Sequence, residues 1–214
     1  MNISREQLIL YAVTDRSWLN GRTLYEQVEE ALEGGTTLVQ LREKNMLDKD
    51  FINEAVPIME LCHRYNVPLI INDRVNVAAE IHADGVHIGQ SDMDAAKARK
   101  ILGPDSIIGV TAKTVEQALK AQAEGADYLG SGAVFGTTTK SDAKPMDIDT
   151  LNAICDSVDI PVVAIGGINN DNVMKLSGSR IAGIAVVSGI FDNEDIKGAA
   201  QSLRAKALNI ISGR

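Results

Sequence analysis

Eight short apolar runs recur along the chain at nearly even spacing, and this feature limits the possible folds more than any other. The runs are rich in Val, Ile, Leu and Ala and do not alternate with polar residues, which is typical of parallel strands buried on both faces. We expect strands at residues 8–13, 37–41, 68–71, 85–88, 107–110, 128–132, 161–165 and 184–187.

Segments with helical periodicity separate these runs. In the segment that begins at Leu24, the apolar residues Leu24, Val28, Ala31 and Leu32 share one face of a helix, and two glycines end it. Further helices are expected near residues 48–65, 74–82, 94–102, 114–124, 147–157 and 169–177, with a last one around 196–203.

Strands that alternate with helices pair in parallel, and right-handed crossovers then fix the direction of winding. About 25 residues per unit favours a closed (β/α)8 TIM barrel. The alternative, an open doubly wound sheet, lacks the G-x-G-x-x-G turn that would bind a dinucleotide. No linker divides the chain, so the sequence predicts one α/β TIM-barrel domain over residues 1–214.

The net charge of the chain restricts its partners. With 21 basic and 29 acidic residues among 214, the charge is −8. A general nucleic-acid binder would carry a basic face, and anionic membranes would repel this chain. A bound anion must therefore be held by a few local cations or by a metal ion.

Cellular location and redox state follow from simple features. Cys62 and Cys155 form no C-x-x-C pair, so reduced thiols are expected. The N-terminus lacks the pattern of a signal peptide, and no apolar run reaches the ~20 residues of a membrane span. These features favour a cytoplasmic protein, and the sequence leaves the oligomeric state open.

Polar residues and glycines gather where the predicted strands end. In a TIM barrel these carboxyl ends meet at one rim, which carries the functional residues. The residues are Gln40, Arg42 and Lys44 after the second run, Asn72 and Asp73 after the third, Gln90 and Asp92 after the fourth, Thr111 after the fifth, Thr137, Thr139 and Lys140 after the sixth, and Gly166, Gly167, Ser188 and Gly189 after the last two.

Asp73 and Asp92 follow neighbouring strands and have two interpretations. Together they suit Mg²⁺, which takes one or two carboxylates plus phosphate oxygens. Each also precedes a predicted helix and could cap it. Asn72, whose amide could hold a phosphate or an aromatic amine, slightly favours a ligand site.

Other residues of the rim point to phosphate. The glycine pairs after the last two strands fit a phosphate cradle better than plain tight turns, because two such loops are adjacent. Arg42, Lys44 and Lys140 are three cations on the same rim, which suits a polyanion such as a diphosphate with Mg²⁺.

The three histidines are weaker signals. His63 and His82 lie on predicted helices and are expected on the surface or in packing contacts. His87 lies within a strand, so a packing role is favoured over catalysis. We see no Ser-His-Asp arrangement and no nucleophilic cysteine beside a histidine.

Seven short motifs in a fixed order resemble the thiamine-phosphate synthase family from about residue 8 to about residue 205. They are "QLREK" (40–44), "ND" (72–73), "DGVHIGQSD" (84–92), "GVTAKT" (109–114), "TTTK" (137–140), "AIGGI" (164–168) and "VVSGI" (186–190). The resemblance implies that hydroxymethylpyrimidine diphosphate couples with hydroxyethylthiazole phosphate to give thiamine phosphate and pyrophosphate, with Mg²⁺ and through a pyrimidine methyl cation.

The resemblance also implies roles for residues of this sequence. Asp73 and Asp92 would bind Mg²⁺, and Lys140 would hold the leaving diphosphate. Lys140, Thr111 and Arg42 are the candidate catalytic residues. The full set expected to contact substrate is Gln40, Leu41, Arg42, Glu43, Lys44, Asn72, Thr111, Thr137, Thr138, Thr139, Lys140, Gly167, Val187 and Ser188.

Two positions depart from the family pattern. Thr111 replaces a common Ser, which keeps the hydroxyl but adds a methyl group that stiffens the side chain. Gly136 replaces a common Pro, which is expected to loosen the loop before "TTTK".

Two other functions remain as alternatives. One is a thiazole tautomerase relative with the same barrel, which the cluster of Gln40, Arg42 and Lys44 and the aspartate pair argue against. The other is a non-catalytic barrel that binds phosphate ligands.

Overall fold

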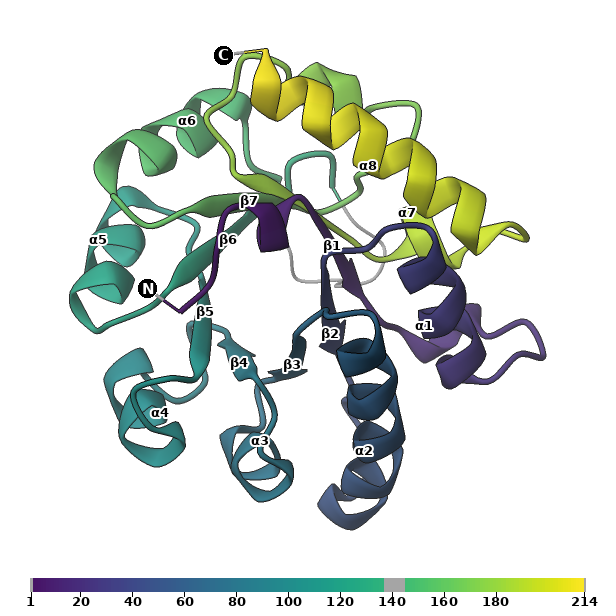
Figure 1. The fold of residues 1–214 in the computed structure, drawn as a ribbon. Coiled ribbons are helices and arrows are strands. Elements are labelled where there is room, and N and C mark those ends of the chain that lie inside the picture. The colour runs from purple at the N-terminus through teal and green to yellow at the C-terminus, as the bar shows by residue number, and fades with distance from the viewer. Residues whose placement is uncertain (1, 137–144, 214) are drawn as a thin grey trace.

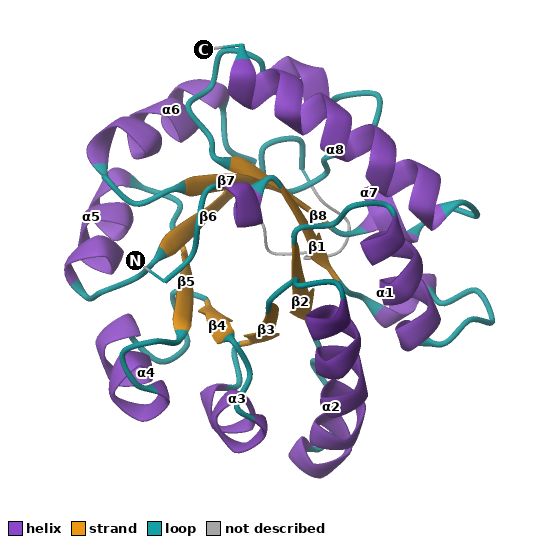
Figure 2. Ribbon diagram, viewed as in Figure 1, coloured by secondary structure: helices purple, strands orange, loops and turns teal. Residues whose placement is uncertain are grey.

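The computed structural model describes residues 2–136 and 145–213, and its strands form a closed parallel barrel in the order β1 to β8 (Figures 1 and 2). β8 pairs with β1, which closes the sheet and excludes the open alternative. The predicted TIM barrel is therefore confirmed, with strand ends shifted by one or two residues from those expected. The strands are Leu10–Val13, Leu38–Leu41, Leu69–Asn72, Gly85–Ile88, Ile107–Thr111, Tyr128–Gly132, Val162–Ile165 and Gly183–Val186.

Helices surround the barrel (Figure 2). The α-helices α1 to α8 are Leu24–Glu33, Asp48–Arg64, Val75–Ile81, Ala95–Leu102, Val115–Ala123, Ile148–Ser157, Ser188–Phe191 and Ile196–Ser212. The 3-10 helices η1 to η3 are Glu6–Leu8, Arg16–Trp18 and Val173–Leu176.

The α-helix predicted near 169–177 is wrong, because this segment forms only the short η3. The side chain of Asn169 accepts hydrogen bonds from the backbone N–H groups of Asp171 and Asn172. The side chain of Asn172 accepts one from the N–H of Asn169. These bonds give the backbone a local alternative to helical pairing, and so delay the start of a helix.

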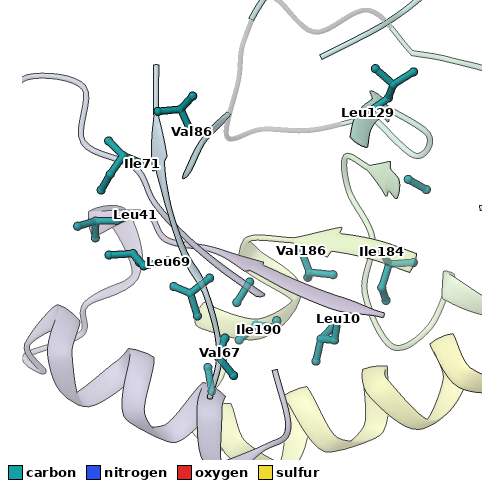
Figure 3. Close-up of a cluster of buried hydrophobic side chains, with 14 of the residues drawn as sticks. Leu10, Leu41, Val67, Leu69, Ile71, Val86, Leu129, Ile184, Val186 and Ile190 are labelled. Carbon is teal, nitrogen blue, oxygen red and sulfur yellow. The ribbon is translucent and has the colours of Figure 1, made fainter. Parts of the chain in front are cut away.

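Alternate strand residues divide the core into two layers. Side chains such as Tyr11, Val13 and Ile70 form a cluster within the barrel. Their neighbours Leu10 and Ile71 point outward and pack beneath the helices, as part of the cluster that Figure 3 shows. Tyr11 and Tyr128 add hydroxyl groups to this otherwise aliphatic inward cluster.

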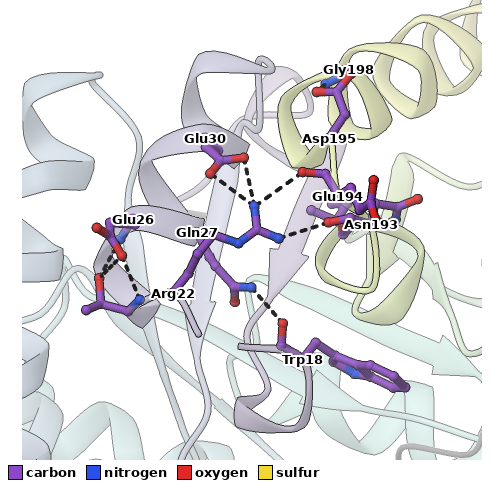
Figure 4. Close-up of polar contacts among 11 residues, drawn as sticks. Trp18, Arg22, Glu26, Gln27, Glu30, Asn193, Glu194, Asp195 and Gly198 are labelled. Atoms are coloured by element: carbon purple, nitrogen blue, oxygen red, sulfur yellow. Dashed lines mark hydrogen bonds and ion pairs between the residues drawn. The ribbon is translucent and has the colours of Figure 1, made fainter. Parts of the chain in front are cut away.

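Arg22 joins the first helix to the last part of the chain (Figure 4). Its Nη1 lies 3.1 Å from a carboxylate oxygen of Glu30 in α1. Its Nη2 donates to the carbonyl of Asn193, 3.0 Å away, in the loop between α7 and α8. Arg22 therefore links α1 to the segment before α8, and α1 and α8 pack against each other.

No helix in residues 2–136 and 145–213 has the length and apolar character needed to cross a membrane. Cys62 is buried, and burial raises the pKa of its thiol to about 12. Neither Cys62 nor Cys155 takes part in a disulfide.

Asp127 connects three segments at the end of the barrel opposite the rim, and we expect Asp127→Ala to lower the free energy of unfolding by about 3 kcal/mol. Its buried carboxylate accepts from Arg99 Nη2 at 2.7 Å, from the N–H of Ile108 at 2.9 Å and from the N–H of Asn2 at 2.7 Å. Chemical denaturation measures the change, with Asp159→Ala at an exposed site as the control. Equal losses for both variants would contradict the prediction.

Candidate functional site

A cavity of about 150 Å³ opens at the carboxyl ends of the strands. Seven of the residues predicted for the site from the sequence line it: Gln40, Arg42, Asn72, Thr111, Gly167, Val187 and Ser188. They come from β2, β3 and β5, from the loops after β2, β7 and β8, and from the start of α7, so the closed barrel brings together positions that are far apart in the sequence.

Arg42 is held at the rim by the loop that follows β1. Its Nη1 lies 2.7 Å from Oδ2 of Asp15, and its backbone N–H donates to Oγ1 of Thr14 at 3.0 Å. Burial alone would raise the pKa of Asp15. Hydrogen bonds from Ser17 and the guanidinium of Arg42 outweigh burial and hold this pKa below its ordinary value. The ion pair orients Arg42 beside the cavity, where it can meet an anionic ligand.

Three residues of the "QLREK" motif do not line the cavity. Leu41 is fully buried in the outward core layer. The carboxylate of Glu43 is buried against Arg16, and burial raises its pKa although Arg16 opposes this shift. Lys44 is exposed, and its carbonyl accepts from Arg74 Nη2 at 3.2 Å. The structure therefore does not bring these three residues to the wall of the cavity.

Neither Asp73 nor Asp92 caps a helix. The cap of α4 is Asp94, whose side chain accepts from the N–H of Lys97, and α3 starts after Arg74 without a side-chain cap. Asp92 Oδ2 instead accepts from the N–H of Gly89 at 2.8 Å, and so closes the turn after β4. The capping interpretation of these two aspartates is wrong.

Asp73 is also set apart by its backbone. It has a φ of +58°, in the left-handed region that non-glycine residues seldom adopt. Its N–H donates to the carbonyl of His87 at 2.9 Å, and its Oδ2 accepts from Asn72 Nδ2 at 2.7 Å. These bonds hold the aspartate at the end of β3, next to β4.

The loop after β7 needs its two glycines. Gly166 and Gly167 have φ values of +104° and +66°. A Cβ at Gly166 would lie 2.4 Å from Cβ of Ala133, and one at Gly167 would lie 2.3 Å from the carbonyl oxygen of Gly136. The glycines therefore let this loop press against the segment after β6 while they line the cavity.

The departure from proline at position 136 has a structural consequence. Gly136 has a φ of +73°. The φ of proline is fixed near −65°, so proline could not adopt the backbone conformation of Gly136.

The remaining candidates Thr137, Thr138, Thr139 and Lys140 lie outside the described residues.

The sequence interpretation missed four polar residues near the cavity: Tyr11, His87, Lys113 and Tyr128. Tyr11, His87 and Lys113 line it. His87 does pack within the barrel as predicted, but its imidazole also bonds to Thr111 and Tyr128. The pairing of neighbouring strands could have identified His87 as a site residue. His87 in β4 lies opposite Asn72 in β3, and Asn72 is predicted as a site residue from the sequence.

The donor set near the rim fits Mg²⁺. Asp73 and Asp92 provide only oxygen ligands, which suits a hard cation. In residues 2–136 and 145–213 no group of three or more His, Cys, Asp or Glu side chains could hold a metal ion. Mg²⁺ usually takes one or two carboxylates from a protein and completes its coordination with substrate phosphates and water, so two aspartates are compatible with it.

Comparison with known proteins identifies the family. The family model described as thiamine monophosphate synthase matches residues 10–190. Thiamine-phosphate synthase of Clostridium tetani is 55% identical over 194 residues, which cover 91% of this chain and 93% of the relative. Thiamine-phosphate synthase of Ruminiclostridium cellulolyticum is 52% identical over 200 residues, which cover 94% and 95%.

Solved structures agree with these matches. Thiamine phosphate pyrophosphorylase from Pyrococcus furiosus superposes with a TM-score of 0.89 at 40% identity, covering 97% of this chain and 98% of the other. KGPDC from Streptococcus mutans, with a TM-score of 0.68 at 15% identity and coverage of 95% and 99%, shares the fold alone. The resemblance drawn from the seven motifs is thus confirmed, and the chain belongs to the thiamine-phosphate synthase family of pyrimidinylmethyl transferases.

Proposed function

We propose that the chain couples hydroxymethylpyrimidine diphosphate with hydroxyethylthiazole phosphate, giving thiamine phosphate and pyrophosphate. The observation that carries this proposal is the composition of the cavity. Gln40, Arg42 and Asn72 belong to β2, the segment after it and β3, while Gly166, Gly167 and Ser188 follow β7 and β8. One cavity thus offers a cation for a diphosphate and a separate glycine-rich loop for a second phosphate.

The proposed reaction breaks one bond and forms another at the same carbon. The C–O bond of the pyrimidine methylene ionises, and its electron pair leaves with the diphosphate. The thiazole nitrogen then donates its lone pair to the methylene carbon. Arg42 would offset charge that grows on the leaving group, and the walls of the cavity would limit the access of water to the cation.

The remaining candidates take roles around these groups. We assign Gln40 and Asn72 to the pyrimidine substrate, and Lys140 to the departing diphosphate. Thr137, Thr138 and Thr139, with Gly167, Val187 and Ser188, would surround the thiazole phosphate. The family resemblance supports all of these roles, and the cavity supports those of the residues that line it.

Asp73 and Asp92 would hold Mg²⁺ in this proposal. The ion would supply positive charge to the diphosphate oxygens. The support is the oxygen-only donor set and the absence of a capping role for either aspartate.

Incubation of the purified protein with both substrates and Mg²⁺ tests the function directly. Thiamine phosphate and pyrophosphate should form in equal amounts, and omission of either substrate should abolish both products. Isomerisation of a thiazole carboxylate phosphate without coupling would instead identify a tautomerase. Binding of phosphate ligands without turnover would identify a non-catalytic barrel.

Thr111→Val is expected to lower kcat/KM about tenfold, whereas Thr111→Ser should keep most of the activity. Valine matches threonine in shape but lacks the hydroxyl, and one lost hydrogen bond costs on the order of 1.4 kcal/mol. Steady-state rates with both substrates measure the effect. Equal rates for Thr111→Val and the parent would show that the hydroxyl has no role.

A further inference from the structure

A chain of hydrogen bonds crosses the floor of the cavity from β2 to β5. Gln40 Nε2 donates to Oη of Tyr11 at 2.5 Å, and Oη of Tyr11 lies 2.8 Å from Oη of Tyr128. The phenol of Tyr128 lies 3.1 Å from His87 Nδ1, and His87 Nε2 lies 3.0 Å from Oγ1 of Thr111. This series of hydrogen bonds thus begins at Gln40 and ends at Thr111, and both residues are proposed to contact substrate.

The barrel is shaped to allow this chain. Gly109 pairs with His87 on one side and with Tyr128 on the other, so all three residues lie at one level. A Cβ at Gly109 would lie 2.1 Å from Cζ of Tyr128 and 2.5 Å from Nδ1 of His87. Only glycine at this position leaves room for the two side chains to meet across β5.

Both phenols in this series of hydrogen bonds are neutral. Tyr11 and Tyr128 are buried, and burial raises the pKa of each well above its ordinary value. Each phenol therefore has one hydrogen to donate and can accept from other donors.

With Gln40 Nε2 as the donor to Tyr11, only one order of protons gives both of these hydrogens an acceptor among the hydrogen-bonded side chains. Because Gln40 Nε2 is already a donor, the hydrogen of Tyr11 must go to Tyr128. The hydrogen of Tyr128 then goes to Nδ1 of His87. If His87 carried its proton on Nδ1 instead, one phenol hydrogen would be left without an acceptor in the chain, at a cost of about 1–3 kcal/mol.

We infer that Tyr11, Tyr128 and His87 are positioning residues that fix the imidazole as its Nε2–H tautomer and thereby make the Thr111 hydroxyl a hydrogen-bond donor toward the cavity. Nε2–H donates to Oγ1 of Thr111, so the hydroxyl hydrogen is not used by the imidazole and is available to a ligand. The opposite tautomer would take that hydrogen, and Thr111 could then only accept.

As a consequence, the floor of the cavity presents a hydrogen-bond donor and an acceptor at defined positions. Thr111 presents a donor, while Gln40, which gives one of its two amide hydrogens to Tyr11, can present its carbonyl oxygen as an acceptor. A ligand ring with an acceptor atom toward Thr111 and a donor group toward Gln40 would match this floor. This statement about the ligand rests on the proposed function, whereas the tautomer of His87 does not.

The tautomer can be measured in the ligand-free protein by 15N NMR. Protonated and unprotonated imidazole nitrogens have well-separated shifts, and replacement of the exposed His63 and His82 by Gln leaves His87 as the single histidine. At pH 8, we expect a protonated Nε2 and an unprotonated Nδ1. A protonated Nδ1, alone or together with Nε2, would overturn the inference whether or not the protein has the proposed activity.

A second test asks whether the hydrogen bonds of Tyr128 and His87 affect the reaction through Thr111. Tyr128→Phe removes the donor to Nδ1, so a fraction of the Nδ1–H tautomer should appear and kcat/KM should fall about tenfold, the effect of one lost hydrogen bond. In a Thr111→Val background, Tyr128→Phe should cause no further loss, because the hydroxyl that it orients is gone. Additive losses would show a merely structural role for Tyr128.

Tyr65→Phe is the matched control for this substitution. Tyr65 is exposed at the end of α2, so its loss should change neither the tautomer of His87 nor the rate. If Tyr128→Phe does not fold, the tautomer of the protein with native Tyr128 still decides the inference.

Discussion

Arg42→Gln is expected to lower kcat/KM by on the order of 10²–10³, the largest effect of any single substitution in the cavity. The guanidinium is already oriented by Asp15 at 2.7 Å, so it needs little rearrangement to meet a diphosphate. A contact with charge that grows on the leaving group acts in the transition state, so kcat should fall more than KM rises. Arg42→Lys should recover only part of the rate, because lysine lacks the planar fork.

The control for Arg42 is Arg180→Gln. Arg180 also pairs with one aspartate, Asp156 at 2.7 Å, but it is 70% exposed. Its substitution should leave the rate unchanged. A rise in KM for the thiazole phosphate alone, after Arg42→Gln, would move Arg42 to the other substrate. Thermal unfolding of each variant separates loss of chemistry from loss of fold.

Asp73→Asn and Asp92→Asn are each expected to raise the Mg²⁺ concentration for half-maximal rate by on the order of tenfold, which corresponds to about 1.4 kcal/mol. Asparagine keeps an oxygen but loses the negative charge that a hard cation prefers. The double variant should lose less than the sum of both effects, because both carboxylates would serve one ion. The measurement is rate against Mg²⁺ for all four proteins.

Asp94→Asn is the matched control for the aspartates. Asp94 lies close to Asp92 in the sequence and caps α4, and asparagine can keep that cap. Its Mg²⁺ dependence should equal that of the parent. If Asp73→Asn and Asp92→Asn also keep the dependence of the parent, the proposed metal site is wrong.

The order of strands and the position of the rim could be predicted from the sequence because they depend on local patterns. Continuous apolar runs indicate buried parallel strands, and polar residues at their ends indicate a shared edge. This reasoning predicts that Gln40, Arg42, Asn72 and Thr111 lie on one rim, and all four line one cavity.

The predictions failed where several local signals compete. The segment 169–177 has apolar residues at helical spacing, but the side chains of Asn169 and Asn172 bond to nearby backbone groups instead. Asp92 and Asp94 both resemble a helix cap by position, and hydrogen bonds alone show that Asp94 is the cap. Such choices depend on free-energy differences that residue types do not reveal.

By itself, then, the sequence determined the (β/α)8 fold, the family and the residues of the rim, because each of these depends on residue type and spacing along the chain. Only the tertiary structure decided how Tyr11, His87, Tyr128 and Thr111 are connected, since these four residues come from four different strands. Their hydrogen bonds form because the barrel pairing sets His87 and Tyr128 at the level of Gly109, which leaves space between the two side chains. A contact between side chains from separate strands depends on the register of those strands and on the space between the side chains. Neither can be derived from the amino-acid sequence alone.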